Sequence, residues 1–125
     1  MTVGYKAYHH NAVATAAPEQ LVVMLFDGAL RFSRRAVASF EAGQRPQATQ
    51  NIARMSSIVN ELNATLDMEA GGDIATNLRS IYAFINRHLI AAVRESDPHR
   101  VRQAANMLAE LREAFAEAAK GVKAA

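Results

Sequence analysis

Cysteine is absent from all 125 residues, and this absence excludes several kinds of chemistry at once. Without a thiol the chain can form no disulfide framework, no thiolate metal site and no cysteine nucleophile. The composition is also compatible with a reducing compartment. Any function of this chain therefore depends on its packing or on side chains other than cysteine.

Long apolar runs are missing as well. No stretch approaches the roughly 18 consecutive apolar residues of a membrane span. The opening residues, MTVGYKAYHHNAV, have neither the charged region nor the apolar region of a signal peptide. We expect a cytosolic protein that does not insert into a membrane.

Charge of one sign is scarce too. Lys and Arg number 14 against 12 Asp and Glu, for a net charge of +2, and both signs occur along the whole chain. Two small arginine clusters, within residues 31–35 and 79–94, are weak evidence for a nucleic-acid binding surface. Solvated helix faces explain such clusters in most proteins, so we expect no nucleic-acid partner.

Proline and glycine are few, and they fall at regular intervals. Breaks at Ala17-Pro18 and at residues 43–46, 71–73 and 96–98 divide the chain into a short lead and four longer segments. Glycine tolerates the left-handed residue that ends a helix, and proline fits the first helical turn. Half of the residues are apolar, many of them alanine, and this composition favours helices.

Apolar residues recur every three or four positions in each of the four segments, as in helices that pack at shallow angles. In residues 46–72 the stripe is Ala48, Ile52, Met55, Val59, Leu62 and Leu66, and in 97–125 it is Val101, Ala104, Leu108, Leu111, Phe115, Ala118 and Val122. In residues 18–45 it is Leu21, Leu25, Gly28, Phe32, Ala36 and Phe40, and in 73–96 it is Ile74, Leu78, Ile81, Ile85, Leu89 and Ala92.

The first and third stripes are flanked by further apolar residues, so these two helices have extra apolar surface, which either the bundle itself or a partner can cover. The short connections predict an all-α, antiparallel up-down four-helix bundle over residues 18–125. Residues 1–17 are predicted to be an irregular or weakly helical lead.

The sequence contains no pattern typical of a catalytic or metal-binding site. A di-iron bundle needs Glu-x-x-His pairs, and the chain contains none. His88 has Phe84 and Ala92 one helical turn away, and neither can act as a partner in acid–base chemistry. We expect no metal, no cofactor and no enzymatic activity.

Two features suggest a binding role without settling it. Gly28 lies within a predicted helix, where glycine costs about 1 kcal/mol relative to alanine. Either Gly28 permits close helix packing, or it opens the floor of a groove beside which Asp27 offers a carboxylate. Tyr5 and Tyr8, with Asn11, indicate that the lead docks on its own bundle or on a partner.

Several motifs together resemble a known family. They are G-Y-K-A-Y-H-H-N in the lead, M-L-F-D-G-A within residues 24–29, I-A-T-N-L within 74–78 and I-N-R-H-L within 85–89. In this order and at these spacings the chain resembles the FliS family of flagellar secretion chaperones over essentially its whole length.

The resemblance implies a cytoplasmic chaperone that binds the disordered C-terminal region of flagellin, prevents premature polymerisation and assists delivery to the export gate. It also implies that the lead covers an apolar groove, because the N-terminal tyrosines do so in that family. The residues expected to bind flagellin or to cap the groove are Tyr5, Tyr8, Asn11, Leu25, Phe26, Asp27, Gly28, Ile85, Asn86, Arg87 and Leu89.

This sequence departs from the family pattern at two positions. Ala17 cannot cap the first helix with its side chain, and His88 stands where a second arginine is common. A self-associating structural bundle is the alternative interpretation. Which flagellin is bound, whether an anti-sigma factor or a co-chaperone shares the groove, and the oligomeric state all stay open.

Overall fold

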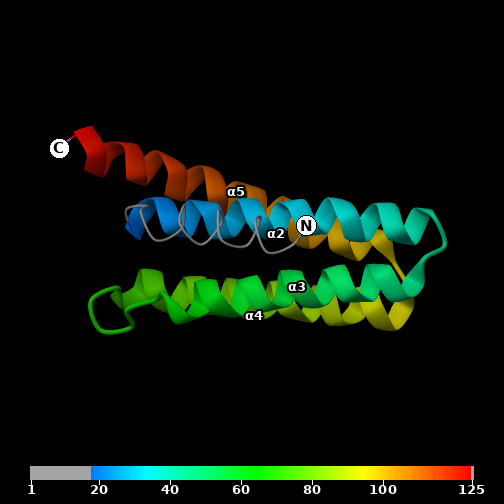
Figure 1. Ribbon diagram of the computed structural model, residues 1–125. Coiled ribbons are helices and arrows are strands. Elements are labelled where there is room, and N and C mark those ends of the chain that lie inside the picture. Colours follow the sequence, from blue (N-terminus) through cyan, green and yellow to red (C-terminus); the bar gives the residue numbers. More distant parts are fainter. Residues whose placement is uncertain (1–17, 125) are drawn as a thin grey trace, which may run out of the picture.

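Four helices make up the part of the chain that the structure describes. The computed structural model covers residues 18–124, with side-chain surroundings through residue 121. The helices are α2 (Pro18–Glu41), α3 (Arg45–Ala64), α4 (Gly72–Glu95) and α5 (Pro98–Ala124). Both α2 and α4 pack against α3 and α5, and α2 with α5 forms one layer above α3 with α4 (Figure 1). The predicted four-helix bundle is confirmed, while the lead, residues 1–17, lies outside the described residues.

One end of the bundle, here called the closed end, holds the short connections 42–44 and 96–97. Gly43 ends α2 with a left-handed φ of 73°, and its N–H donates to the Phe40 carbonyl at 3.0 Å. Asp97 accepts the N–H of His99 at 2.9 Å and thereby caps α5. Arg45, at the start of α3, donates to the carbonyl of Val93 near the end of α4 at 3.3 Å.

The opposite end, here called the open end, holds residues 65–71, the start of α2 and the last turns of α5 (Figure 1). α3 ends at Ala64, earlier than the predicted segment 46–72. The reason is local, because the Asp67 carboxylate accepts the N–H groups of Glu69 and Ala70 at 3.1 and 3.0 Å and forms a turn. Leu66, predicted on the helical stripe, lies in this connection and still packs partly against the core.

The core follows the predicted stripe of α3 and the first half of that of α5, beyond which Leu111 and Phe115 are partly buried and Ala118 is exposed. The core members on these two helices are Ala48, Ile52, Met55, Val59, Leu62, Val101, Ala104 and Leu108. On α2 two members of the predicted stripe, Gly28 and Ala36, are buried together with Phe26, Ala29 and Ser33, which lie off it. On α4 the buried residues are Ala75, Tyr82, Ile85, Leu89, Ala91 and Ala92, whereas Ile74 is 73% exposed. A helix with more than one apolar face offers several stripes of equal spacing, so spacing alone did not select the buried one.

Two polar side chains lie within this core. Ser33 is buried, and its hydroxyl donates to the carbonyl of Leu30 at 2.6 Å. Tyr82 is 2% exposed, and burial raises the pKa of its hydroxyl to about 12. Both side chains are therefore uncharged in the folded bundle near neutral pH.

Candidate partner-binding surface

The first turns of α2 carry apolar side chains on more than one face. Phe26 points into the core, while Leu21 and Met24 keep part of their surface exposed. With neighbouring side chains they border a depression of about 460 Å³ between α2 and α3. This depression, the α2–α3 cleft, is lined by Pro18, Leu21, Val22, Met24, Leu25, Glu61 and Thr65.

A second depression, of about 400 Å³, lies at the open end itself. Because α3 stops at Ala64, its last turn does not cover the start of α4, and Ile74 is left exposed. Phe115 of α5 forms another wall, with its ring centre 5.3 Å from that of Phe26. This end cleft is lined by Val22, Thr65, Leu66, Asp67, Ala70, Gly71, Ile74, Ala75, Leu78 and Phe115.

The two clefts adjoin, because Val22 and Thr65 line both of them. Glu61 lies at the edge of the α2–α3 cleft, and the exposed Met68 belongs to the connection beside the end cleft. The result is an apolar surface that runs around the open end with acidic groups at its margin. A groove of this kind between two helices suits the apolar face of a partner helix.

Three of the four apolar residues expected to contact a partner lie in the core. Phe26 and Ile85 are fully buried and Leu89 is 1% exposed. These side chains pack the bundle and offer no surface for docking in this fold. Leu25 alone among the four lines a cleft, where it is only partly buried.

Gly28 lies where α2 packs closely against α3. A Cβ added there would lie 3.3 Å from Cδ1 of Ile58, which is tighter than ordinary contact. Of the two interpretations left open by the sequence, close helix packing has a direct contact to support it. Because Gly28 is buried, it belongs to the floor between the two helices.

Asp27 has a partner within the chain. Its Oδ1 accepts a hydrogen bond from Nε of Arg112 on α5 at 2.9 Å, and Arg112 also contacts Glu113 at 3.0 Å. The hydrogen bond to Asp27, aided by the one to Glu113, raises the pKa of Arg112 above its ordinary value. The carboxylate of Asp27 therefore ties α2 to α5, on the side of α2 away from the α2–α3 cleft.

Asn86 and Arg87 lie on α4, far along the bundle from the apolar clefts. The Asn86 amide accepts a hydrogen bond from Ser56 and donates one to Asn60, each at 3.0 Å, so it links α4 to α3. Arg87 is exposed, and its guanidinium carbon lies 5.6 Å from the ring centre of Phe84. Neither side chain lines a cleft together with Leu25.

Other expected site residues fall outside the described part of the chain, namely Tyr5, Tyr8 and Asn11. Conversely, most of the cleft residues were not expected to contact a partner, among them Leu21, Met24 and Ile74. Leu21 and Ile74 looked like core because they have stripe spacing. Met24 had a usable signal, since it is an apolar residue off the stripe in a run of six apolar residues, LVVMLF.

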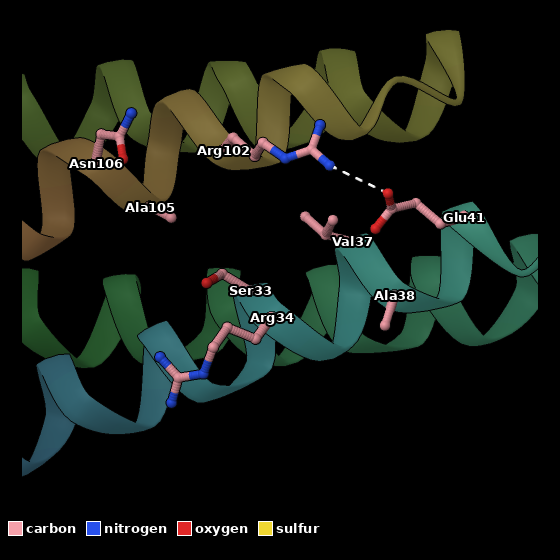
Figure 2. A pocket seen from close by; sticks show the side chains of 8 residues that line it. All are labelled: Ser33, Arg34, Val37, Ala38, Glu41, Arg102, Ala105 and Asn106. Carbon is pink, nitrogen blue, oxygen red and sulfur yellow. Dashed lines mark ion pairs between the residues drawn. The ribbon is translucent and has the colours of Figure 1, made fainter.

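A further depression, of about 360 Å³, lies between α2 and α5 toward the closed end. Figure 2 shows Arg102 of α5 reaching toward Glu41 of α2 across it, and the two form an ion pair at 3.4 Å. Its lining is mixed in charge and includes the buried Ser33. This α2–α5 cleft therefore differs in kind from the apolar surface at the open end.

The described residues show no arrangement suited to metal binding or to membrane insertion. No three His, Asp or Glu side chains gather there as a metal site requires. None of the helices within residues 18–124 has the length and apolar character to cross a membrane. The fold and its apolar clefts define a class of protein, helical bundles with an apolar groove between helices, a shape that suits an amphipathic segment.

Comparison with known proteins identifies the family within this class. The family described as "Flagellar protein FliS" matches residues 1–122. A flagellar secretion chaperone FliS of Salmonella typhimurium is 36% identical over 117 residues, covering 90% of this chain and 87% of the relative. The chaperone of the same name from Campylobacter jejuni is 32% identical over 115 residues (92% and 90%), and that of Bacillus subtilis 28% over 114 residues (91% and 84%). The chain belongs to the FliS family of flagellar secretion chaperones.

Proposed function

We propose that this chain is a cytosolic export chaperone that binds the disordered C-terminal segment of flagellin, keeps it from polymerising early and assists its delivery to the export gate. The observation that supports this best is the apolar α2–α3 cleft, continuous with the end cleft, in a member of a family of secretion chaperones. A disordered segment can fold along such a surface as it binds.

The proposed mechanism is stoichiometric and needs neither catalysis nor a cofactor. Apolar residues that flagellin would otherwise use to pack against its neighbours are covered in the clefts instead. Burial of apolar surface supplies most of the affinity, while the polar margin, with Glu61 and Thr65, limits the registers that the segment can adopt.

The test is a calorimetric titration of the full chain with a peptide of about the last forty residues of flagellin from the same organism, longer than the roughly 20 to 30 residues that one side of an ordinary interface uses. We expect one-to-one binding with a negative change in heat capacity. No binding by a folded chain would refute the flagellin assignment.

A matched pair of variants locates the binding surface. Met24 lines the α2–α3 cleft, whereas Ile90 is 63% exposed on α4 and lines neither apolar cleft. Met24→Gln should weaken binding about tenfold, since burying a methionine side chain is worth at least about 1.5 kcal/mol. Ile90→Gln should bind like the wild type. Equal affinities for both variants would move the site away from this cleft.

The lead is proposed to cap the groove, with Tyr5, Tyr8 and Asn11 as the capping residues. If it competes with flagellin, Tyr8→Ala should tighten flagellin binding or lower the stability of the unbound chain. Unchanged affinity together with unchanged stability would rule out this role.

Self-association is the second candidate, supported by the exposed Phe84 and Ile90 on the outer face of α4. Size-exclusion chromatography over a wide concentration range separates the two proposals. A concentration-independent monomer that binds flagellin removes the structural role, whereas an oligomer that binds no flagellin favours it.

A further inference from the structure

Two arginines lie over one phenylalanine on the same α2–α3 face, nearer the closed end than the apolar cleft, and a third arginine of α2 lies beside Gly28. The guanidinium carbons of Arg35 and Arg54 each lie 5.5 Å from the ring centre of Phe32. Nη2 of Arg31 lies 3.8 Å from the position that a Cβ on Gly28 would take, and so beside the floor between α2 and α3. We call Arg31, Arg35, Arg54 and Phe32 the arginine patch.

The positive charges of this patch are not balanced by the chain around them. Within residues 18–121 no carboxylate forms an ion pair with Arg31, Arg35 or Arg54. On the α5 side of α2 the situation is reversed, because Arg102 and Arg112 each have a carboxylate of α2 as partner. The patch therefore concentrates like charges that an external anion would stabilise.

The chain's own lead cannot supply that anion. Residues 1–17 contain Lys6 and no Asp or Glu. α3 has a single acidic residue, Glu61, which lies about two helical turns beyond Arg54 at the edge of the cleft. A carboxylate for the patch must come from another molecule.

We propose that the arginine patch binds an acidic stretch of the protein partner whose apolar residues occupy the α2–α3 cleft. Guanidinium groups pair with carboxylates through two parallel hydrogen bonds, and the contact with Phe32 holds Arg35 and Arg54 in place beforehand. The proposal rests on the proposed function and adds a chemical requirement to it. From Leu25 to Arg35 α2 rises about 15 Å, so a helical partner carries its carboxylates roughly three turns beyond its apolar anchors.

The first test uses an acidic probe and no flagellin. The full ¹⁵N-labelled chain is titrated with hexaglutamate, and the arginine Nε–Hε resonances are followed by NMR. We expect those of Arg31, Arg35 and Arg54 to shift along one saturation curve, and that of the exposed Arg79 on α4 to stay in place. The shifts should fade in about 0.5 M salt, where charges are screened within a few Å. Absent shifts, or equal shifts at Arg79, overturn the proposal.

The second test asks whether the partner uses the patch. The double variant Arg35→Gln with Arg54→Gln should bind the flagellin segment about tenfold more weakly than wild type in low salt, and the difference should disappear in high salt. Arg79→Gln is the matched control and should bind normally. Normal binding by the double variant overturns the proposal even if hexaglutamate binds.

The two tests keep the proposals distinguishable. If hexaglutamate shifts the patch but the flagellin segment does not bind to the wild-type chain, the flagellin assignment fails and the carboxylate site stands. If the segment binds but the patch responds to neither test, the carboxylate site fails and the chaperone function stands. A larger response to hexauridylate than to hexaglutamate overturns the proposal in favour of a phosphate-binding surface.

Discussion

At the closed end, connections 42–44 and 96–97 bring the helices tightly together, and polar groups such as Asp97 and Arg45 hold the turns. At the open end, residues 65–71 replace the last turn that α3 was predicted to have, and apolar side chains of α2 and α4 stay partly uncovered. The α2–α5 cleft toward the closed end has a lining of mixed charge, including the pair Arg102–Glu41.

This contrast between the closed end and the open end shows how one helix can contribute both to the packed core and to a candidate binding surface. α4 buries Leu89 toward the closed end and exposes Ile74 at the open end, although both residues belong to the same predicted stripe. A partner that covers the open end gains apolar burial in the two adjoining clefts there.

The largest effect should come from comparing these two residues of α4. Leu89→Ala should lower the free energy of unfolding by about 2 to 5 kcal/mol, because it leaves a cavity in the core. Ile74→Ala should change it by less than about 0.5 kcal/mol, because little packing is lost at an exposed position. Urea denaturation measures both. Equal losses would show that the open end is packed as tightly as the rest.

Tyr82 probes whether the core between the two ends excludes water. Its pKa is about 12 in the folded bundle against an ordinary 10.0, so the unfolded chain loses the proton first as pH rises. This contribution to stability is complete below pH 10 and is lost toward pH 12, by up to about 2 kcal/mol. Denaturation curves at several pH values measure the fall. Tyr82→Phe should reduce it, and an identical fall in that variant would contradict the assignment.

Two backbone positions at opposite ends should respond in opposite directions. Ser96 ends α4 at the closed end with a left-handed φ of 51°, and Gly72 begins it at the open end with φ 50°. Ser96→Gly should stabilise the chain by up to about 1 kcal/mol, and Gly72→Ala should destabilise it by about 1 kcal/mol. Thermal unfolding measures both. A stabilising Gly72→Ala would show that the backbone at the open end relaxes easily.

The smallest effects are expected from the exposed ion pairs between α2 and α5. Asp27→Asn and Glu41→Gln remove the pairs with Arg112 and Arg102, and each should lower the melting temperature less than Gly72→Ala does. The differences from wild type should shrink further in about 0.5 M salt. Calorimetric melting at two salt concentrations checks this. A loss as large as that of Leu89→Ala would mean that one pair is fully shielded from water.

Much of the fold was predictable because α3 and α5 each carry one dominant apolar stripe. Met55 and Leu108 lie at the centres of these stripes and are fully buried. On α2 and α4 several stripes compete, and the choice depends on which neighbour each face meets. Phe26 lies off the predicted stripe of α2 and is nevertheless buried, whereas Ile85 and Leu89 lie on the predicted stripe of α4. All three were expected at a partner surface from the family resemblance and lie in the core.

The candidate site was less predictable than the fold. Leu25 was identified from the sequence, whereas Met24 and the end cleft were not. The end cleft forms because α3 ends early, and no periodicity in the sequence marks the residue at which α3 ends. Asp67 stops the helix through hydrogen bonds to the backbone, which is a local signal that the stripe through Leu66 obscured.

The four helices within residues 18–124, their approximate limits and the buried faces of α3 and of the first half of α5 followed from the sequence alone, because helix caps, turns and a single apolar stripe are local properties. The motifs also indicated the family. Three other features depend on how the helices pack. The packing selects the buried faces of α2 and α4, and it pairs Asp27 with Arg112. It also leaves Arg31, Arg35 and Arg54 without ion-pair partners within residues 18–121. These features arise between helices distant in sequence, and their energies depend on which side chains the packing brings together.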